Sequence, residues 1–342
     1  MAIELTGVVR YDTESGYGQA GEPWGRYRRT LPQVFGEGAH RFQVVDNWVK
    51  RPRGMSLGDV AGVAVDAADH VYLYTRSAHP VQVFDADGNF IRWWGQSDHT
   101  APHGITVARD GNLWLADTGD HMVKKYTPEG RPLLALGNRH QNATRMSGQP
   151  FNMPTRVAEA PNGDIWVSDG YGNNHIHIFT ADGDHRRTFG GLGTGPGQFD
   201  TPHSIVIDHN ERVYVCDRQN DRIQIFNLDG EFQEEWLGVH EPDDLTVGSD
   251  GTVYVAELQH RISIWNQHGQ RVAGWGDEGC DCGPGPLPPK QCSGEHMDAG
   301  MVIGPHGIAI DSQGAFYVGD LSDSYRGIDR GSRSIQKFVP LK

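Results

Sequence analysis

Three Pro-His pairs recur along the sequence, and their histidines are the residues best suited to chemistry. His103, His203 and His306 each follow a proline, and each lies fourteen residues before an aspartate. Neutral imidazole nitrogens are common ligands of divalent metal ions, and three of them leave positions open for water or a substrate. If the chain brings the three together, they predict a catalytic metal site. Zinc is the first expectation, with iron, manganese and cobalt as alternatives.

The histidines belong to a repeated unit that must position them. Each copy has a short apolar strand, a polar turn, a second strand that ends near an acid and an alternating third strand, and the first five copies add a final strand ending in Trp-Gly, Phe-Gly or Leu-Gly. Alternation with a period of two and Asp-Gly turns indicate strands and hairpins. The six copies span 58–95, 102–137, 154–190, 202–238, 241–276 and 305–338.

Four strands per copy of this length predict the blade of a β-propeller, so we expect an all-β, six-bladed fold. The copies resemble NHL repeats. The sixth copy lacks a clear fourth strand, and segment 41–49 is expected to supply it and close the ring. We therefore expect an N-terminal extension over 1–40, one propeller domain over 41–342, and an insertion over 277–304 between blades five and six.

Blade register places the histidines on one level. An acid ends the second strand of five blades, and Arg76 is assigned to that position in blade one. A step back of fourteen residues reaches Gly62, His103, Thr155, His203, Asp243 and His306. Innermost strands surround the propeller axis, so histidines from alternate blades should point inward as a three-fold collar. The acids are expected to be structural; they are Asp117, Asp169, Asp217, Glu257 and Asp320.

The same register places three further candidates beside the collar. Arg76, Tyr171 and Arg218 stand at or just after the end of a second strand, where the chain returns to the face that carries the histidines. Each departs from the repeat pattern, which favours a functional role, although a surface salt bridge is an alternative for each arginine. The loops 138–153, 191–201 and 277–304 are expected to form walls around this mouth.

Net charge and the distribution of apolar residues limit the binding partners and the cellular location that we expect. The formal net charge of −14 argues against nucleic acid, whose phosphates need Lys and Arg. No apolar run approaches the roughly 18 residues of a membrane span, and the N-terminus has no secretory signal, so we expect no membrane partner and a cytoplasmic protein. Clustered Cys280, Cys282 and Cys292 favour a flexible insertion over a second metal site. Oligomeric state stays open.

Three segments sharpen the chemistry. WVSDGYGNNHIHIF, GPGQFDTPHSIVI and VYVCDRQNDRIQIF, in this order, resemble the catalytic core of peptidyl-α-hydroxyglycine α-amidating lyase. That family is a six-bladed propeller with zinc held by three histidines, and it cleaves a C–N bond to give an amide and glyoxylate. The resemblance implies that His103, His203 and His306 bind zinc. It also implies that Tyr171 is the catalytic base and that Arg76 and Arg218 are active-site arginines.

The resemblance has departures, and alternatives remain. The family binds a structural calcium through an acid just after the third histidine, where this chain has Gly307, so a calcium ion is doubtful. The expected function is a metal-dependent lyase acting on a carbinolamide, an α-hydroxyglycine-like small molecule or short peptide. The alternatives are a metal-dependent hydrolase of the lactonase or amidase kind and a non-catalytic NHL scaffold.

Overall fold

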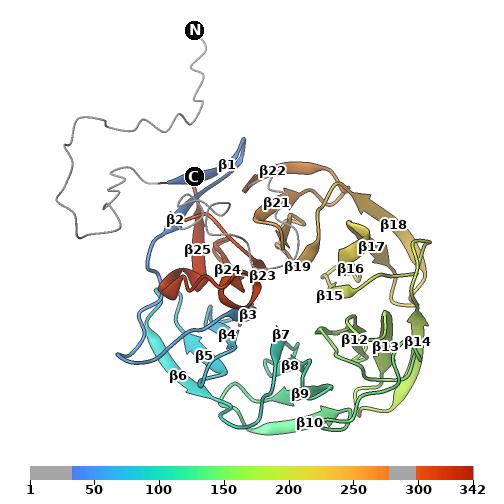
Figure 1. Cartoon of the computed structure of the whole chain (residues 1–342). Helices are drawn as coiled ribbons and strands as arrows, with labels where there is room; N and C mark the ends of the chain where they lie inside the picture. The colour runs from blue at the N-terminus through green and yellow to red at the C-terminus, as the bar shows by residue number, and fades with distance from the viewer. Residues whose placement is uncertain (1–32, 277–297, 342) are drawn as a thin grey trace, which may run out of the picture. The chain divides into compact units, whose positions relative to one another are not determined.

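Six sheets, five with four strands and one with five, form a ring in the computed structural model, which describes residues 33–276 and 298–341. Figure 1 shows the innermost strands β3, β7, β15, β19 and β23 around a common centre. Blades one to three contain β3 (Val60–Val65), β4 (Val71–Thr75), β5 (Val81–Phe84), β6 (Phe90–Trp94); β7 (Pro102–Val107), β8 (Leu113–Asp117), β9 (Met122–Tyr126), β10 (Pro132–Leu136); β11 (Arg156–Glu159), β12 (Ile165–Asp169), β13 (His175–Phe179) and β14 (His185–Gly190). The six-bladed all-β fold is confirmed.

Blades four and five have the same four-strand order, and the C-terminal part of the chain gives blade six only three strands. They contain β15 (Pro202–Ile207), β16 (Val213–Asp217), β17 (Arg222–Phe226), β18 (Phe232–Leu237); β19 (Pro242–Val247), β20 (Val253–Glu257), β21 (Arg261–Trp265), β22 (Arg271–Gly276); β23 (Pro305–Ile310), β24 (Phe316–Asp320) and β25 (Ile335–Pro340). Short helices are η1 (Arg218–Asn220), α1 (Ser322–Arg326) and η3 (Gly331–Ser334). In the described part of the chain, no helix is long and apolar enough to cross a membrane.

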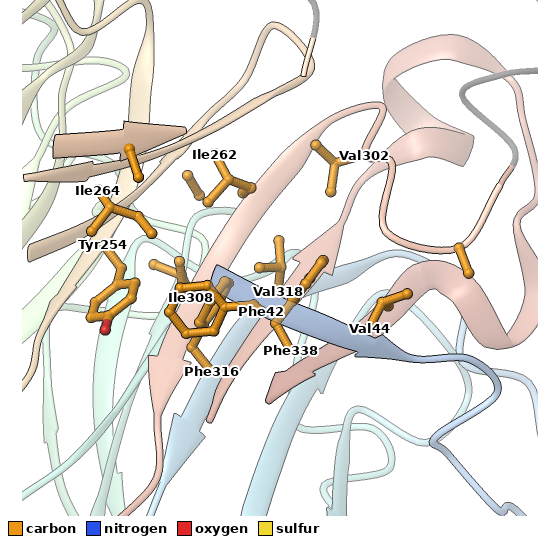
Figure 2. Close-up of a cluster of buried hydrophobic side chains, with 13 residues drawn as sticks. Phe42, Val44, Tyr254, Ile262, Ile264, Val302, Ile308, Phe316, Val318 and Phe338 are labelled. Atoms are coloured by element: carbon orange, nitrogen blue, oxygen red, sulfur yellow. The ribbon is translucent and has the colours of Figure 1, made fainter. Parts of the chain in front are cut away.

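An N-terminal strand completes blade six. β2 (His40–Val45) pairs antiparallel with β25, and β1 (Val34–Glu37) pairs with β2, which gives the sheet order β1-β2-β25-β24-β23. Phe42 is buried in the blade-six core with Phe316 and Phe338 (Figure 2). Burial of one such side chain contributes about 1.5–3 kcal/mol, so this contact stabilises the closed ring. Ring closure by an N-terminal strand agrees with expectation, but β1 lies inside the range 1–40 expected to precede the propeller.

The expected cysteine cluster, and most of the expected insertion between blades five and six, lie outside the described residues. Cys280, Cys282 and Cys292 lie in 277–297, and so does most of the expected 277–304 insertion. Cys216 in β16 is a free, buried thiol.

The acids at the ends of the second strands hold the inter-blade segments. Asp117 accepts hydrogen bonds from the backbone N–H groups of Thr100 and Ala101, at 2.8 and 2.9 Å. Asp320 accepts equivalent bonds from Ile303 and Gly304, at 2.9 and 3.0 Å. Each carboxylate therefore fixes the segment that enters the innermost strand of its own blade, which is a structural role for this part of the pattern.

Blade one departs from the expected register by one residue. Val60 pairs with Thr75, as Pro202 pairs with Asp217 in blade four. Thr75 therefore takes the position of the acid, and Arg76 corresponds to the next residue along, as Arg218 does. The residue at the level of the histidines is then Ala61. The assignment of Gly62 to the histidine level and the assignment of Arg76 to the acid position were therefore both wrong. Arg76 nevertheless remains on the face predicted for it.

Candidate metal centre

The three histidines meet at the propeller axis. The ring centroids of His103, His203 and His306 lie 4.6–4.7 Å apart in each pair. One nitrogen from each ring lies within 4.8 Å of those from the other two. Each side chain is almost completely buried. The predicted convergence of residues separated by as many as 203 positions (His103 to His306) is therefore present in the fold.

A local irregularity directs the imidazoles inward. Pro202 pairs with Asp217 and Ser204 pairs with Cys216, so one strand advances two residues while the other advances one. His203 is the extra residue of this β-bulge, and His306 has the same place between Pro305 and Gly307. A bulge bends the strand and changes the direction of a side chain, which explains how a residue in an innermost strand reaches the axis.

Backbone carbonyls of the following blades orient all three rings. The Nδ1 atom of His103 lies 2.8 Å from the carbonyl oxygen of Thr155, that of His203 lies 2.7 Å from Asp243, and that of His306 lies 2.6 Å from Ala61. A carbonyl oxygen only accepts, so each Nδ1 carries the proton and each Nε2 has a free lone pair. The tautomer needed by a metal ligand is thereby set.

The electrostatics of the collar keep it neutral. Burial is the main cause that holds the pKa of each imidazole well below its ordinary value of 6.5. The positive charge of Arg218 adds to this effect at all three histidines, and that of Arg76 adds to it at His103 and His306. Nε2 of His306 is buried and has no hydrogen-bond partner among the described residues. A buried, unprotonated nitrogen without a partner is costly on its own. Together, the three convergent Nε2 atoms fit a divalent ion such as zinc.

Tyr171 lies directly against the collar. Its hydroxyl is 3.1 Å from Nε2 of His103 and 2.8 Å from Nε2 of His203. Arg218 donates to the same hydroxyl over 3.4 Å, and its guanidinium carbon lies 5.2 Å from the centre of the tyrosine ring. Burial raises the pKa of Tyr171, although Arg218 and Arg76 act in the opposite direction. The phenol therefore keeps its proton at neutral pH unless more positive charge is placed beside it.

The segment around Tyr171 is held from one side by the loop 138–153. Gly172 donates its N–H to the carbonyl oxygen of Asn152 over 3.0 Å, and Met146 donates to the carbonyl of Gly172. A Cβ atom at Gly172 would lie 2.1 Å from Oδ1 of Asn152, so only glycine allows this approach. This loop therefore forms a wall beside Tyr171, as expected from its position in the repeat.

The two arginines differ in their surroundings. Arg218 is mostly buried and donates to Oδ1 of Asp243 over 3.1 Å. Arg76 is exposed at the rim, where it donates to the Ser324 hydroxyl over 2.9 Å and to the Pro102 carbonyl oxygen over 3.4 Å. Both lie on the face that carries Tyr171, and both influence the pKa of His103.

Asp243 was missed as a functional candidate. Burial raises its pKa to about 7, although Arg218 lowers it, and its Oδ2 atom is buried without a hydrogen-bond partner in the described chain. Its carbonyl orients His203 and its carboxylate holds Arg218, so one residue connects a ligand and an arginine. The signal was available, because Asp243 stands at the histidine level of blade five.

The layer below the collar contains an internal ion pair. The Nη1 atom of Arg156 lies 2.5 Å from Oδ2 of Asp244, and both side chains are buried. Asp244 also accepts from the Ser204 hydroxyl and from the backbone N–H of Ile308, at 2.7 and 3.0 Å. The guanidinium thus places a fixed positive charge one layer below the collar, next to the strand of Gly307. These residues do not fit the structural calcium that the family resemblance implies.

Comparisons with known proteins agree with this architecture. A family profile described as a 6-bladed beta-propeller matches residues 151–239, and an NHL repeat profile matches residues 100–126. The fold and repeats therefore define an NHL-repeat propeller. The human NHL repeat-containing protein 3 is 31% identical over 321 residues, which cover 86% of this chain and 83% of the human protein. The chain belongs to the NHL repeat-containing protein 3 family.

Two further likenesses bear on the site and the fold. Peptidyl-alpha-hydroxyglycine alpha-amidating lyase 1 of Drosophila melanogaster is 34% identical over 156 residues, which cover 42% of this chain and 28% of the fly protein. A gluconolactonase structure from Xanthomonas campestris superposes with a TM-score of 0.61 at 14% identity, over 91% of this chain and 95% of that chain. The second likeness concerns the fold alone.

Proposed function

We propose that this protein is a metal-dependent lyase that cleaves the C–N bond of an α-hydroxyglycine-like carbinolamide. The products would be a primary amide and glyoxylate. The observation that carries the proposal is the position of the Tyr171 hydroxyl, within 3.1 Å of Nε2 of both His103 and His203. A group able to move a proton therefore lies at the point where the free histidine nitrogens converge. Similarity to the fly amidating lyase supports the same chemistry.

The Nε2 atoms of His103, His203 and His306 would hold the ion, with zinc as the first expectation. When bound, such an ion would supply positive charge that lowers the pKa of a hydroxyl group beside it and stabilises the resulting anion. The proximity of Tyr171 to two of the three nitrogens means that this charge would also act against the effect of burial on the phenol.

Residues of this chain would transfer the proton and would bind the negatively charged carboxylate of the substrate. Tyr171 Oη would take the proton from the substrate hydroxyl while the C–N bond breaks and the carbonyl of glyoxylate forms. The same oxygen would return a proton to the departing amide nitrogen, so atoms and charge balance. Arg218, 3.4 Å from that oxygen, would hold the substrate carboxylate, and Arg76 at the rim would assist.

Two measurements test the proposal together. Purified protein is analysed for metal, and it is then incubated with N-benzoyl-α-hydroxyglycine beside a protein-free control for spontaneous breakdown. We expect about one metal ion per chain and release of benzamide with glyoxylate. His203→Ala should lose both the metal and the activity. His268→Ala is the matched control, because His268 is an exposed histidine on an outer turn, and this variant should keep both.

The products separate the alternatives. An amidase would release benzoate instead of benzamide, and a non-catalytic scaffold would release neither above the control. Full activity in the His203→Ala variant, or activity in protein that contains no metal, would refute the metal-dependent mechanism.

A further inference from the structure

Blade six carries a long connection at a position where the other blades have short ones. The connection between the second and third strands spans 321–334 in blade six and includes α1 and η3. The corresponding connections in the other blades span 76–80, 118–121, 170–174, 218–221 and 258–260. Arg76, Tyr171 and Arg218 all lie in these connections. The blade-six connection therefore lies on the same face as the candidate site.

The start of this connection is fastened to the rim of the site. The Asp59 carboxylate accepts hydrogen bonds from the backbone N–H groups of Asp323 and Ser324, at 3.0 and 2.9 Å. Arg76 donates to the Ser324 hydroxyl over 2.9 Å. Leu321 donates its N–H to the carbonyl oxygen of Gly304 over 2.8 Å. Helix α1 is thus held in place by one of the two arginines of the site.

The Tyr325 side chain extends from α1 over the residue that precedes β23. It packs against Gly304, two residues before His306, where a Cβ atom would lie 3.1 Å from Cδ1 of Tyr325. The guanidinium carbon of Arg326 lies 3.9 Å from the centre of the Tyr325 ring, which restricts the motion of that ring. Burial raises the pKa of the Tyr325 phenol, Arg326 lowers it, and Asp243 and Arg218 contribute smaller effects of opposite sign.

We propose that Tyr325 is a specificity-determining residue that contacts the acyl group of the substrate and selects an aromatic or branched apolar one. This inference rests on the proposed function. A hydroxyglycine has no substituent beyond its carboxylate, so all variation among such substrates lies on the acyl side of the scissile bond. With the carboxylate held by Arg218, the acyl group emerges along the rim. A half-buried, immobilised aromatic ring at that rim offers apolar and ring-stacking contact.

The test compares two substrates that differ only in the acyl group. The ratio of kcat/KM for N-benzoyl-α-hydroxyglycine to that for N-acetyl-α-hydroxyglycine is measured on metal-loaded protein. We expect the wild-type protein to favour the benzoyl compound, and Tyr325→Ala to lower the ratio about tenfold. Tyr325→Phe keeps the ring and should keep the ratio. Leu237→Ala, at a side chain that is 64% exposed on β18, is the matched control and should also keep it.

Two outcomes would overturn the inference: a wild-type protein with no preference, or equal ratios in the wild-type and Tyr325→Ala proteins. If neither compound is turned over, the proposed function is wrong. Binding measurements then test on their own whether Tyr325 contacts the acyl group. Calorimetry with the unreactive N-benzoylglycine and N-acetylglycine should then show tighter binding of the benzoyl compound, and Tyr325→Ala should lose that difference. Equal binding of both compounds to both proteins would refute the specificity role.

Discussion

Removing either partner of the ion pair below the collar should destabilise the protein, but the cost of the two removals should depend differently on pH. Arg156 and Asp244 are both buried, and the guanidinium Nη1 lies 2.5 Å from the carboxylate Oδ2. Removing one partner of a buried pair costs about 3–5 kcal/mol, because the other charge is left without compensation. The two substitutions differ in what the remaining partner can do. A guanidinium cannot lose its proton, whereas a carboxylate can take one up.

Arg156→Met leaves a carboxyl group that can respond to pH. Burial already raises the pKa of Asp244 and Arg156 lowers it, so the pKa rises further when Arg156 is removed. A carboxyl whose folded-state pKa exceeds its unfolded value stabilises the fold at low pH, and this stabilisation is lost as the pH rises toward the folded-state pKa. The variant should therefore recover stability relative to the wild-type protein as the pH is lowered from 7 toward 5, by at most about 1.4 kcal/mol per pH unit.

Asp244→Asn leaves the guanidinium of Arg156 buried and charged at both pH values, so its cost should stay at about 3–5 kcal/mol. Denaturant unfolding followed by tryptophan fluorescence at pH 7 and pH 5, relative to the wild-type protein, measures both effects. Arg186→Met is the control, because the Arg186 side chain is 56% exposed in its pair with Asp164, so that this pair should contribute about 1 kcal/mol or less. An Asp244→Asn cost that falls at pH 5 as much as the Arg156→Met cost would refute the reasoning.

Three further predictions concern the site itself. Tyr171→Phe should lower kcat by about 10²–10⁴ without loss of metal or a large change in Tm, because only the proton-transferring hydroxyl is removed; steady-state kinetics and metal analysis check this. Asp243→Asn should raise KM for a carboxylate substrate about tenfold and change kcat less, because Arg218 loses a charged hydrogen bond worth about 1.5–3 kcal/mol. Gly172→Ala should lower both kcat and stability, the latter by about 1–3 kcal/mol, because its Cβ would meet Asn152; kinetics and denaturant unfolding show whether both fall together.

The repeat and the collar could be predicted because they depend on local pattern. Alternating strands and turns recur in each blade, and a fixed step between the histidine and the acid survives in the folded register. Blade one shows the limit of this reasoning. Arg76 was assigned to the acid position when the copies were matched at the ends of their second strands, but backbone pairing gives that position to Thr75. Strand register follows hydrogen bonding between strands, and a single polar side chain does not report it.

Contacts between distant blades were beyond sequence reasoning. Arg156 in blade three pairs with Asp244 in blade five, which also binds groups in blades four and six. Nothing in the local sequence around Arg156 indicates its partner, because the pair forms only when the ring closes. The connection 321–334 was likewise overlooked, since its length has meaning only beside the shorter connections of the other blades.

The alternation of histidines has a physical cause in the carbonyl contacts. Each imidazole needs a partner for Nδ1 so that Nε2 remains free, and the partner is the carbonyl of the equivalent residue in the next blade, namely Thr155, Asp243 or Ala61. A carbonyl belongs to the backbone, so the side chains of these three residues can vary without loss of the contact. One blade in each pair therefore supplies a ligand and the other orients it. This division leaves the Asp243 side chain available to hold Arg218, which connects metal ligation to the recognition of an anionic substrate.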